Sequence, residues 1–189
     1  MTRIVLTPSM VESYERCPWM TYLENVCELP PSAVFENVLG SACHIFIAGL
    51  HKPRIYQDKV PKNLNVRFTA KHVDKSWPRF WTRWLRRVRV RELHGEILKS
   101  FESEGLVLGP LYIKRYLSFK RAMQVEPDKV EFAFPQTHIP ETSVDLNARV
   151  DQIRMGSGGG DILLDLKFSP RNNFDPHSNF ALRCYSLLY

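Results

Sequence analysis

The sequence predicts an α/β protein of the α+β kind, in which helices come first and strands follow. Apolar residues recur at helical spacing in several stretches before residue 125. Strand-like alternation of apolar and polar residues then occupies Lys129–Phe134 and the stretch Val144–Ser169. With 189 residues, one domain is expected, mostly helical over 1–125 and carrying the strands and a last helix over 126–189.

The first two helices are delimited by capping residues and prolines. Ser9 is expected to cap a helix that kinks or breaks at Pro18. Ser32, after a pair of prolines, is expected to cap a second helix that ends near Leu50.

His44 lies on the second predicted helix. A lone histidine on a mostly apolar helix is more often a hydrogen-bonded core residue than a metal ligand, and both interpretations stay open. Gly40 lies one turn earlier, where glycine costs about 1 kcal/mol relative to alanine. We therefore expect another backbone or a substrate to approach closely at Gly40.

A long third helix is predicted from about Val73 to Phe101. Its aromatic residues recur on one side and favour a core role, although aromatic rings also stack on unpaired bases. No acidic residue interrupts the basic run from Lys75 to Arg91, and the chain carries a net charge of +6. This pattern predicts a polyanion partner. Four residues are assigned to DNA binding, namely Arg79, Arg83, Arg86 and Arg87.

The second half of the chain is organised around a predicted β-hairpin with arms Val144–Arg154 and Asp161–Phe168. A glycine-rich run between them allows a tight reversal. If Met155 faces Asp161 across the turn, the same register places Asp151 opposite Asp165.

Paired carboxylates at this point suggest a metal site. They repel unless a cation lies between them, and oxygen ligands favour Mg²⁺ or Mn²⁺. Lys167 shares a strand face with Asp165, where it can orient or deprotonate a water and offset charge on a phosphate. The alternative is a solvated polar face with a chance ion pair. Glu131 either adds an acidic group nearby or is an ordinary exposed strand residue.

Four motifs, in this order, resemble the RecB-like branch of the PD-(D/E)XK nuclease superfamily, which includes CRISPR-associated and AddB-type exonucleases. The motifs are Ser9 to Tyr14 with Cys17, Pro18 and Tyr22; Gly40 to His44; Ala148 to Asp151 with Asp165 to Lys167; and Tyr185.

The resemblance implies a restriction-endonuclease-like core, a central mixed sheet with a catalytic hairpin flanked by helices, plus an N-terminal helical elaboration. It implies that His44, Asp151 and Asp165 hold Mg²⁺ or Mn²⁺ with the carbonyl of Leu166, and that Lys167 handles the attacking water. Tyr185 occupies the late tyrosine motif and joins the expected catalytic residues. The implied activity is a metal-dependent deoxyribonuclease, an exonuclease or an enzyme that processes ends or single strands.

Three departures from the family pattern matter. Ala148 replaces a usual glycine, and Ala181 stands where a glutamine is expected four residues before Tyr185. Of the four cysteines of the family's iron–sulfur cluster, Cys17 alone matches, so no cluster is expected. The family core also continues beyond the last helix into another strand. Either the chain is a piece of a longer protein, or another element, a second copy or a partner subunit completes the sheet.

Two other classes of function are alternatives to a nuclease. A catalytically inactive, nuclease-like DNA-binding module is favoured by Ala181, whereas a structural protein with a basic face leaves the paired carboxylates unexplained. The expected partner is DNA, as single strands or duplex ends. No signal-peptide pattern and no apolar run long enough to cross a bilayer was found, so a soluble, cytoplasmic protein without membrane association is expected.

Overall fold

The computed structural model describes residues 4–27, 35–51, 70–87, 95–123, 129–154 and 160–168, together with Ala181, Cys184, Tyr185 and Leu188. The chain divides into two compact units. The strand unit comprises Met1–Ser32, Asp128–Asp165 and Arg171–Tyr189, and the helical unit comprises Ala33–Pro127 and Leu166–Pro170. Helices combined with two small sheets confirm the predicted mixed α/β class.

The strand unit begins with β1 (Ile4–Leu6), α1 (Pro8–Arg16) and α2 (Pro18–Asn25). The predicted cap Ser9 is wrong, because Thr7 caps α1 and its hydroxyl accepts a 3.2 Å hydrogen bond from the Met10 amide. The predicted break at Pro18 is confirmed. Cys17 is extended, and Pro18 begins α2 at the first helical position, where its missing N–H has no cost.

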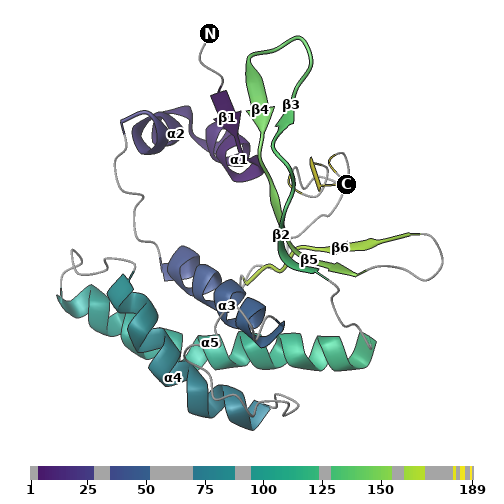
Figure 1. The fold of residues 1–189 in the computed structure, drawn as a ribbon. Coiled ribbons are helices and arrows are strands. Elements are labelled where there is room, and N and C mark those ends of the chain that lie inside the picture. The colour runs from purple at the N-terminus through teal and green to yellow at the C-terminus, as the bar shows by residue number, and fades with distance from the viewer. Residues whose placement is uncertain are drawn as a thin grey trace. The chain divides into compact units, whose positions relative to one another are not determined.

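Two three-stranded sheets follow, shown in Figure 1. One has the order β1–β4–β3, in which β4 (Val144–Leu146) is parallel to β1 and antiparallel to β3 (Thr137–His138). The other has the order β2–β5–β6 and is antiparallel, with β2 at Lys129–Ala133, β5 at Arg149–Arg154 and β6 at Ile162–Leu164.

The predicted single arm Val144–Arg154 is wrong, because it forms two strands in two different sheets. The change of partner occurs at Asn147 and Ala148. The Asn147 amide donates to the Leu6 carbonyl at 2.8 Å, whereas the Ala148 carbonyl accepts from the Phe134 amide at 2.9 Å. One sheet therefore ends and the other begins at this dipeptide.

The predicted hairpin register is confirmed. Gln152 pairs with Leu164, Ile153 with Leu163 and Arg154 with Ile162, which is the register that places Asp151 opposite Asp165. The second arm is shorter than predicted, because β6 ends at Leu164 and residues 165–168 are not in a strand. Of the predicted glycine turn, residues 156–159 lie outside the described part of the chain.

The described residues near the C-terminus cover the second sheet. Ala181, Tyr185 and Leu188 are helical and share an apolar cluster with Phe134, Phe132, Ala148, Val150, Ile153 and Leu163. The predicted last helix from about His177 otherwise lies outside the described residues.

The helical unit consists of α3 (Phe35–His51), α4 (Ala70–Arg87) and α5 (Gly95–Met123), seen together in Figure 1. The second predicted helix corresponds to α3, although its predicted cap Ser32 is outside the described residues. The predicted single helix from Val73 to Phe101 is wrong. The Trp77 indole donates a 2.8 Å hydrogen bond to the Gly105 carbonyl, a contact that one continuous helix would separate by about 42 Å. The chain instead reverses, and α4 and α5 pack antiparallel.

Tryptophans of α4 form the centre of this unit. Trp77 and Trp81 are fully buried and stacked at 5.8 Å, which confirms the predicted core role of these aromatics and leaves them unavailable to bases. The Trp84 indole donates to the Val38 carbonyl of α3 at 3.2 Å. The close approach predicted at Gly40 is not found, since a Cβ added there would meet no atom within 4 Å among the described residues.

None of the helices in the described ranges is long and apolar enough to cross a membrane.

Candidate active site

Asp151 lies in the middle of β5, the central strand of its sheet. Its neighbours Val150 and Gln152 are buried, and β2 and β6 pair with β5 on either side. The paired residues on both sides of Asp151 fix the position of this strand. The half-buried Asp151 carboxylate is therefore carried by the central strand of its sheet.

Asp165 and Tyr185 lie near Asp151 within the same unit. Burial raises the pKa of the Tyr185 phenol, and the negative charges of Asp165 and Asp151 raise it further, in that order. The Tyr185 ring is stacked on Phe134 with 6.0 Å between ring centroids and a 17° interplanar angle. The charges of Asp151 and Asp165 are thus close enough to act on the Tyr185 phenol.

The sequence leaves the role of Glu131 open, and the structure shows where its side chain lies. The pairs Val130–Gln152 and Phe132–Val150 flank it, so that Glu131 stands opposite Asp151. A carboxylate oxygen of each residue lies within 4.8 Å of the other. Glu131 also has a φ of 50°, in the left-handed region that non-glycine residues rarely occupy. Pairing of β2 with β5 could have indicated this facing pair from the sequence, but nothing in the sequence indicates the backbone conformation.

The other predicted metal and catalytic residues belong to the helical unit. His44 is half-buried on α3, and its ring meets the Phe168 ring edge-to-face at 4.9 Å. Leu166 and Phe168 pack against the core of that unit, and Lys167 between them is exposed. The structure therefore gathers His44 and the segment following Asp165 on one side of α3.

The carboxylates of Glu131 and Asp151 suit a hard divalent cation. Oxygen ligands of this kind favour a hard ion over a soft, thiolate-bound metal. The close approach of the Glu131 and Asp151 oxygens is itself repulsive and is relieved by a cation.

None of the four cysteines forms a disulfide; they are Cys17, Cys27, Cys43 and Cys184. Cys43 is buried in α3, and burial raises the pKa of its thiol to about 12. That this chain carries no iron–sulfur cluster stays a prediction.

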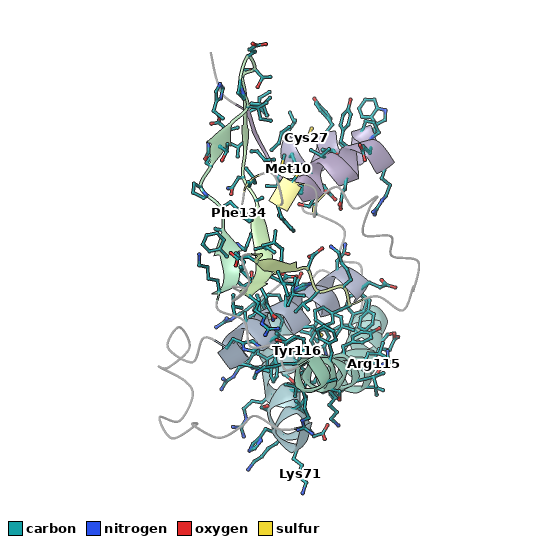
Figure 2. The ribbon with its side chains drawn as sticks, turned by 90° about the vertical axis from the view of Figure 1, so that its right-hand side faces the viewer. Met10, Cys27, Lys71, Arg115, Tyr116 and Phe134 are labelled. Carbon is teal, nitrogen blue, oxygen red and sulfur yellow. The ribbon has the colours of Figure 1, made fainter. Side chains whose placement is uncertain are left out.

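A basic ladder lies on α4. It consists of Lys71, Lys75, Arg79, Arg83 and Arg87, each four residues after the last, with Arg86 beside it, and all six are exposed. The buried residues Val73, Trp77, Trp81 and Leu85 define the opposite side of the helix. Figure 2 shows Lys71 extending away from the helices. The predicted four arginines are thus on a solvent-facing surface.

This basic ladder spans about 24 Å, with a cation roughly every 6 Å. Asp74, the acidic residue of α4, forms an ion pair of 2.6 Å with Lys114 of α5. Within α4, this ion pair leaves no other acidic residue to offset the charge of the ladder.

The position of Ala181 explains one departure from the family pattern. Its side chain is buried in the apolar cluster that also holds Ala148, Val150 and Tyr185. A small apolar residue fits this packing, and a glutamine amide would need a hydrogen-bond partner there. In this chain, Ala181 therefore packs against the second sheet.

The chain matches a known protein family. A family model described as the PD-(D/E)XK nuclease superfamily matches residues 5–189, nearly the whole chain. A search among curated proteins finds no match.

Proposed function

The chain belongs to the PD-(D/E)XK nuclease superfamily, and on that premise we propose that it is a metal-dependent deoxyribonuclease of the RecB-like branch. Its substrates would be DNA ends or single strands, in recombination, repair, or phage- or CRISPR-related processing. The observation that carries the proposal is the grouping of Asp151, Asp165 and Tyr185, in which both carboxylates act electrostatically on one buried phenol.

Asp151, Asp165, His44 and the Leu166 carbonyl would hold the cation. When bound, a divalent cation supplies Lewis-acid stabilisation for the charge that builds on a phosphate and helps to activate water. Lys167 is exposed and can reach a phosphate or a water from the segment that follows Asp165. Tyr185, whose raised pKa keeps it protonated, would donate a hydrogen bond and not act as a base.

The role of His44 as a ligand rests on the motif Gly40 to His44. Within the helical unit, the His44 ring contacts Phe168, which directly follows Lys167 in the sequence.

Arg79, Arg83, Arg86 and Arg87 would bind the phosphates of the DNA. Regular spacing of cations along one exposed helix face favours a strand-shaped polyanion over a compact anion. The ladder contacts phosphates and reads no bases, so the proposal includes no sequence preference from this surface.

The test is cleavage of end-labelled single-stranded and duplex DNA with Mn²⁺, with Mg²⁺ and with chelator. Wild type is compared with Lys167→Ala, with Lys99→Ala as the control because Lys99 is an exposed lysine on α5. We expect metal-dependent cleavage that Lys167→Ala lowers by about 100-fold or more and that Lys99→Ala leaves unchanged. The product ladder gives the polarity.

Failure of wild type to cleave under any of these conditions would overturn the proposal. Salt-sensitive DNA binding retained in that case would favour the alternative, an inactive, nuclease-like DNA-binding module.

A further inference from the structure

The backbone of Glu131 is strained within β2, between residues that pair in register with β5. Glu131 has a φ of 50° although residues 129, 130, 132 and 133 of β2 all pair in register with β5. A non-glycine residue in this region costs roughly 1–3 kcal/mol and persists only where the surroundings impose it. Glutamate is not among the residues that tolerate this conformation well, which raises the question of what its side chain does.

Its carboxylate points to an answer. A Glu131 oxygen lies within 4.8 Å of an Asp151 oxygen. Two oxygens bound to one divalent cation are each about 2.0–2.6 Å from it, so such a pair spans up to about 5 Å. The two carboxylates are therefore close enough to share one ion, and they repel without it.

The ion pair that Glu131 forms with Arg149 is weak. The Arg149 Nη1 lies 3.8 Å from Glu131 Oε2, and the Arg149 side chain is 66% exposed. A long, solvent-exposed contact of this kind contributes about 0–1 kcal/mol, which does not offset the strain.

We propose that Glu131 is a further ligand of the divalent cation held at Asp151, and that its left-handed backbone places the carboxylate on the ion. The inference rests on the proposed nuclease function and adds a residue to its site. It predicts that the backbone conformation of Glu131 lowers the stability of the metal-free chain and that its carboxylate strengthens metal binding.

The test is Mn²⁺ binding without DNA, measured on the full chain by calorimetry and by the metal-dependent rise in Tm. Glu131→Gln is expected to weaken Mn²⁺ binding about tenfold or more, since even partners outside the ligand shell change affinity 10- to 100-fold. Glu131→Gly, which relieves the strain, is expected to weaken it equally without lowering the Tm of the metal-free chain. Urea unfolding of each variant establishes that it is folded.

Glu141→Gln is the matched control. Glu141 is also a glutamate of the strand unit with a positive φ, 62°, but it is exposed in the turn between β3 and β4. Its variant removes the same charge and is expected to bind Mn²⁺ as wild type does. Arg149→Ala is expected to leave Mn²⁺ binding unchanged or to strengthen it, because it removes a competing cation.

Unchanged Mn²⁺ affinity in Glu131→Gln would overturn the inference while leaving the nuclease proposal intact if wild type binds Mn²⁺ and cleaves DNA. Loss of affinity in Arg149→Ala equal to that in Glu131→Gln would also overturn it, since the ion pair would then be the acting element. A wild-type chain that neither binds Mn²⁺ nor cleaves would overturn both proposals.

Discussion

The Trp77 indole nitrogen donates a hydrogen bond of 2.8 Å to the main-chain oxygen of Gly105. This bond joins α4 to α5. Two indole rings of α4 lie directly on glycines of α5 there, and we call this contact the tryptophan seam. Trp81 lies on Gly105, and Trp77 lies on Gly109, one turn further along α5. The absence of a side chain at both positions allows the rings to reach the α5 backbone.

Gly105→Ala and Gly109→Ala are therefore expected to destabilise the helical unit. A Cβ at either position would overlap the indole carbons, and a stacked, fully buried tryptophan has no room to move aside. We expect each variant to lower the free energy of unfolding by about 1–3 kcal/mol, measured by urea denaturation.

Gly40→Ala provides the control for that prediction. Gly40 is inside α3, where an added Cβ meets nothing within 4 Å among the described residues. Because alanine forms helices better than glycine, this variant is expected to gain about 0.5–1 kcal/mol. Equal losses at Gly40 and Gly105 would mean that helix propensity, and not the tryptophan seam, decides the outcome.

The seam also shows where sequence reasoning fails in this protein. Helical periodicity identified the buried face of α4 but extended it through Phe101, because periodicity does not reveal a chain reversal. The packing of Trp77 on Gly105 requires that reversal, and it depends on a contact between residues 28 apart in the sequence.

The hairpin shows the opposite case. Its register was predictable because a short reversal between two alternating segments leaves few pairings that keep apolar residues inside. The three observed pairs of β5 with β6 follow that register. The early end of β6 and the left-handed Glu131 were not predictable, since each depends on the packing around it and not on local preference.

Cys43 is expected to resist thiol reagents. Burial raises the pKa of its thiol from 9.0 to about 12, so that almost no thiolate forms near pH 8. Cys27 is exposed on the strand unit and is expected to react much faster. Labelling of the folded chain at pH 8, followed by mass mapping, checks the order, and urea should make the two cysteines equivalent. Fast modification of Cys43 without denaturant would contradict its buried placement.

Tyr185→Phe is expected to reduce the loss of stability at alkaline pH. Burial, Asp165 and Asp151 raise the folded-state pKa of Tyr185 above its usual 10.0, so the unfolded chain ionises first. The contribution of this group is thus complete below pH 10 and is lost as the pH rises towards the folded-state pKa. Wild type should lose up to about 1.4 kcal/mol per pH unit more than the variant above pH 10.

The variant is suited to this measurement because phenylalanine can keep the stacking on Phe134. Urea unfolding of both proteins at pH 8, 10 and 11 gives the difference, and the ionisation of Cys43 is common to both. Parallel stability curves for the two proteins would contradict both the burial of the Tyr185 hydroxyl and its position near the carboxylates.

The basic ladder on α4 predicts the salt dependence of DNA binding. Each cation that neutralises a phosphate changes the slope of log K against log salt by about 0.7 for single strands and 0.9 for duplex. Arg83→Ala with Arg87→Ala is therefore expected to weaken binding and to flatten the slope by about 1.4 to 1.8. The measurement is fluorescence anisotropy with a labelled oligonucleotide between 50 and 200 mM salt, with chelator present to stop cleavage.

Arg115→Ala with Arg121→Ala is the control for this double variant. Both arginines are exposed on α5 and lie off the basic ladder, so the pair removes the same net charge from the same unit. If the spacing along α4 matters, the control slope should stay near that of wild type. Equal flattening by the two double variants would show that DNA responds to the total charge of the helical unit, and the ladder would then have no special role in holding the strand.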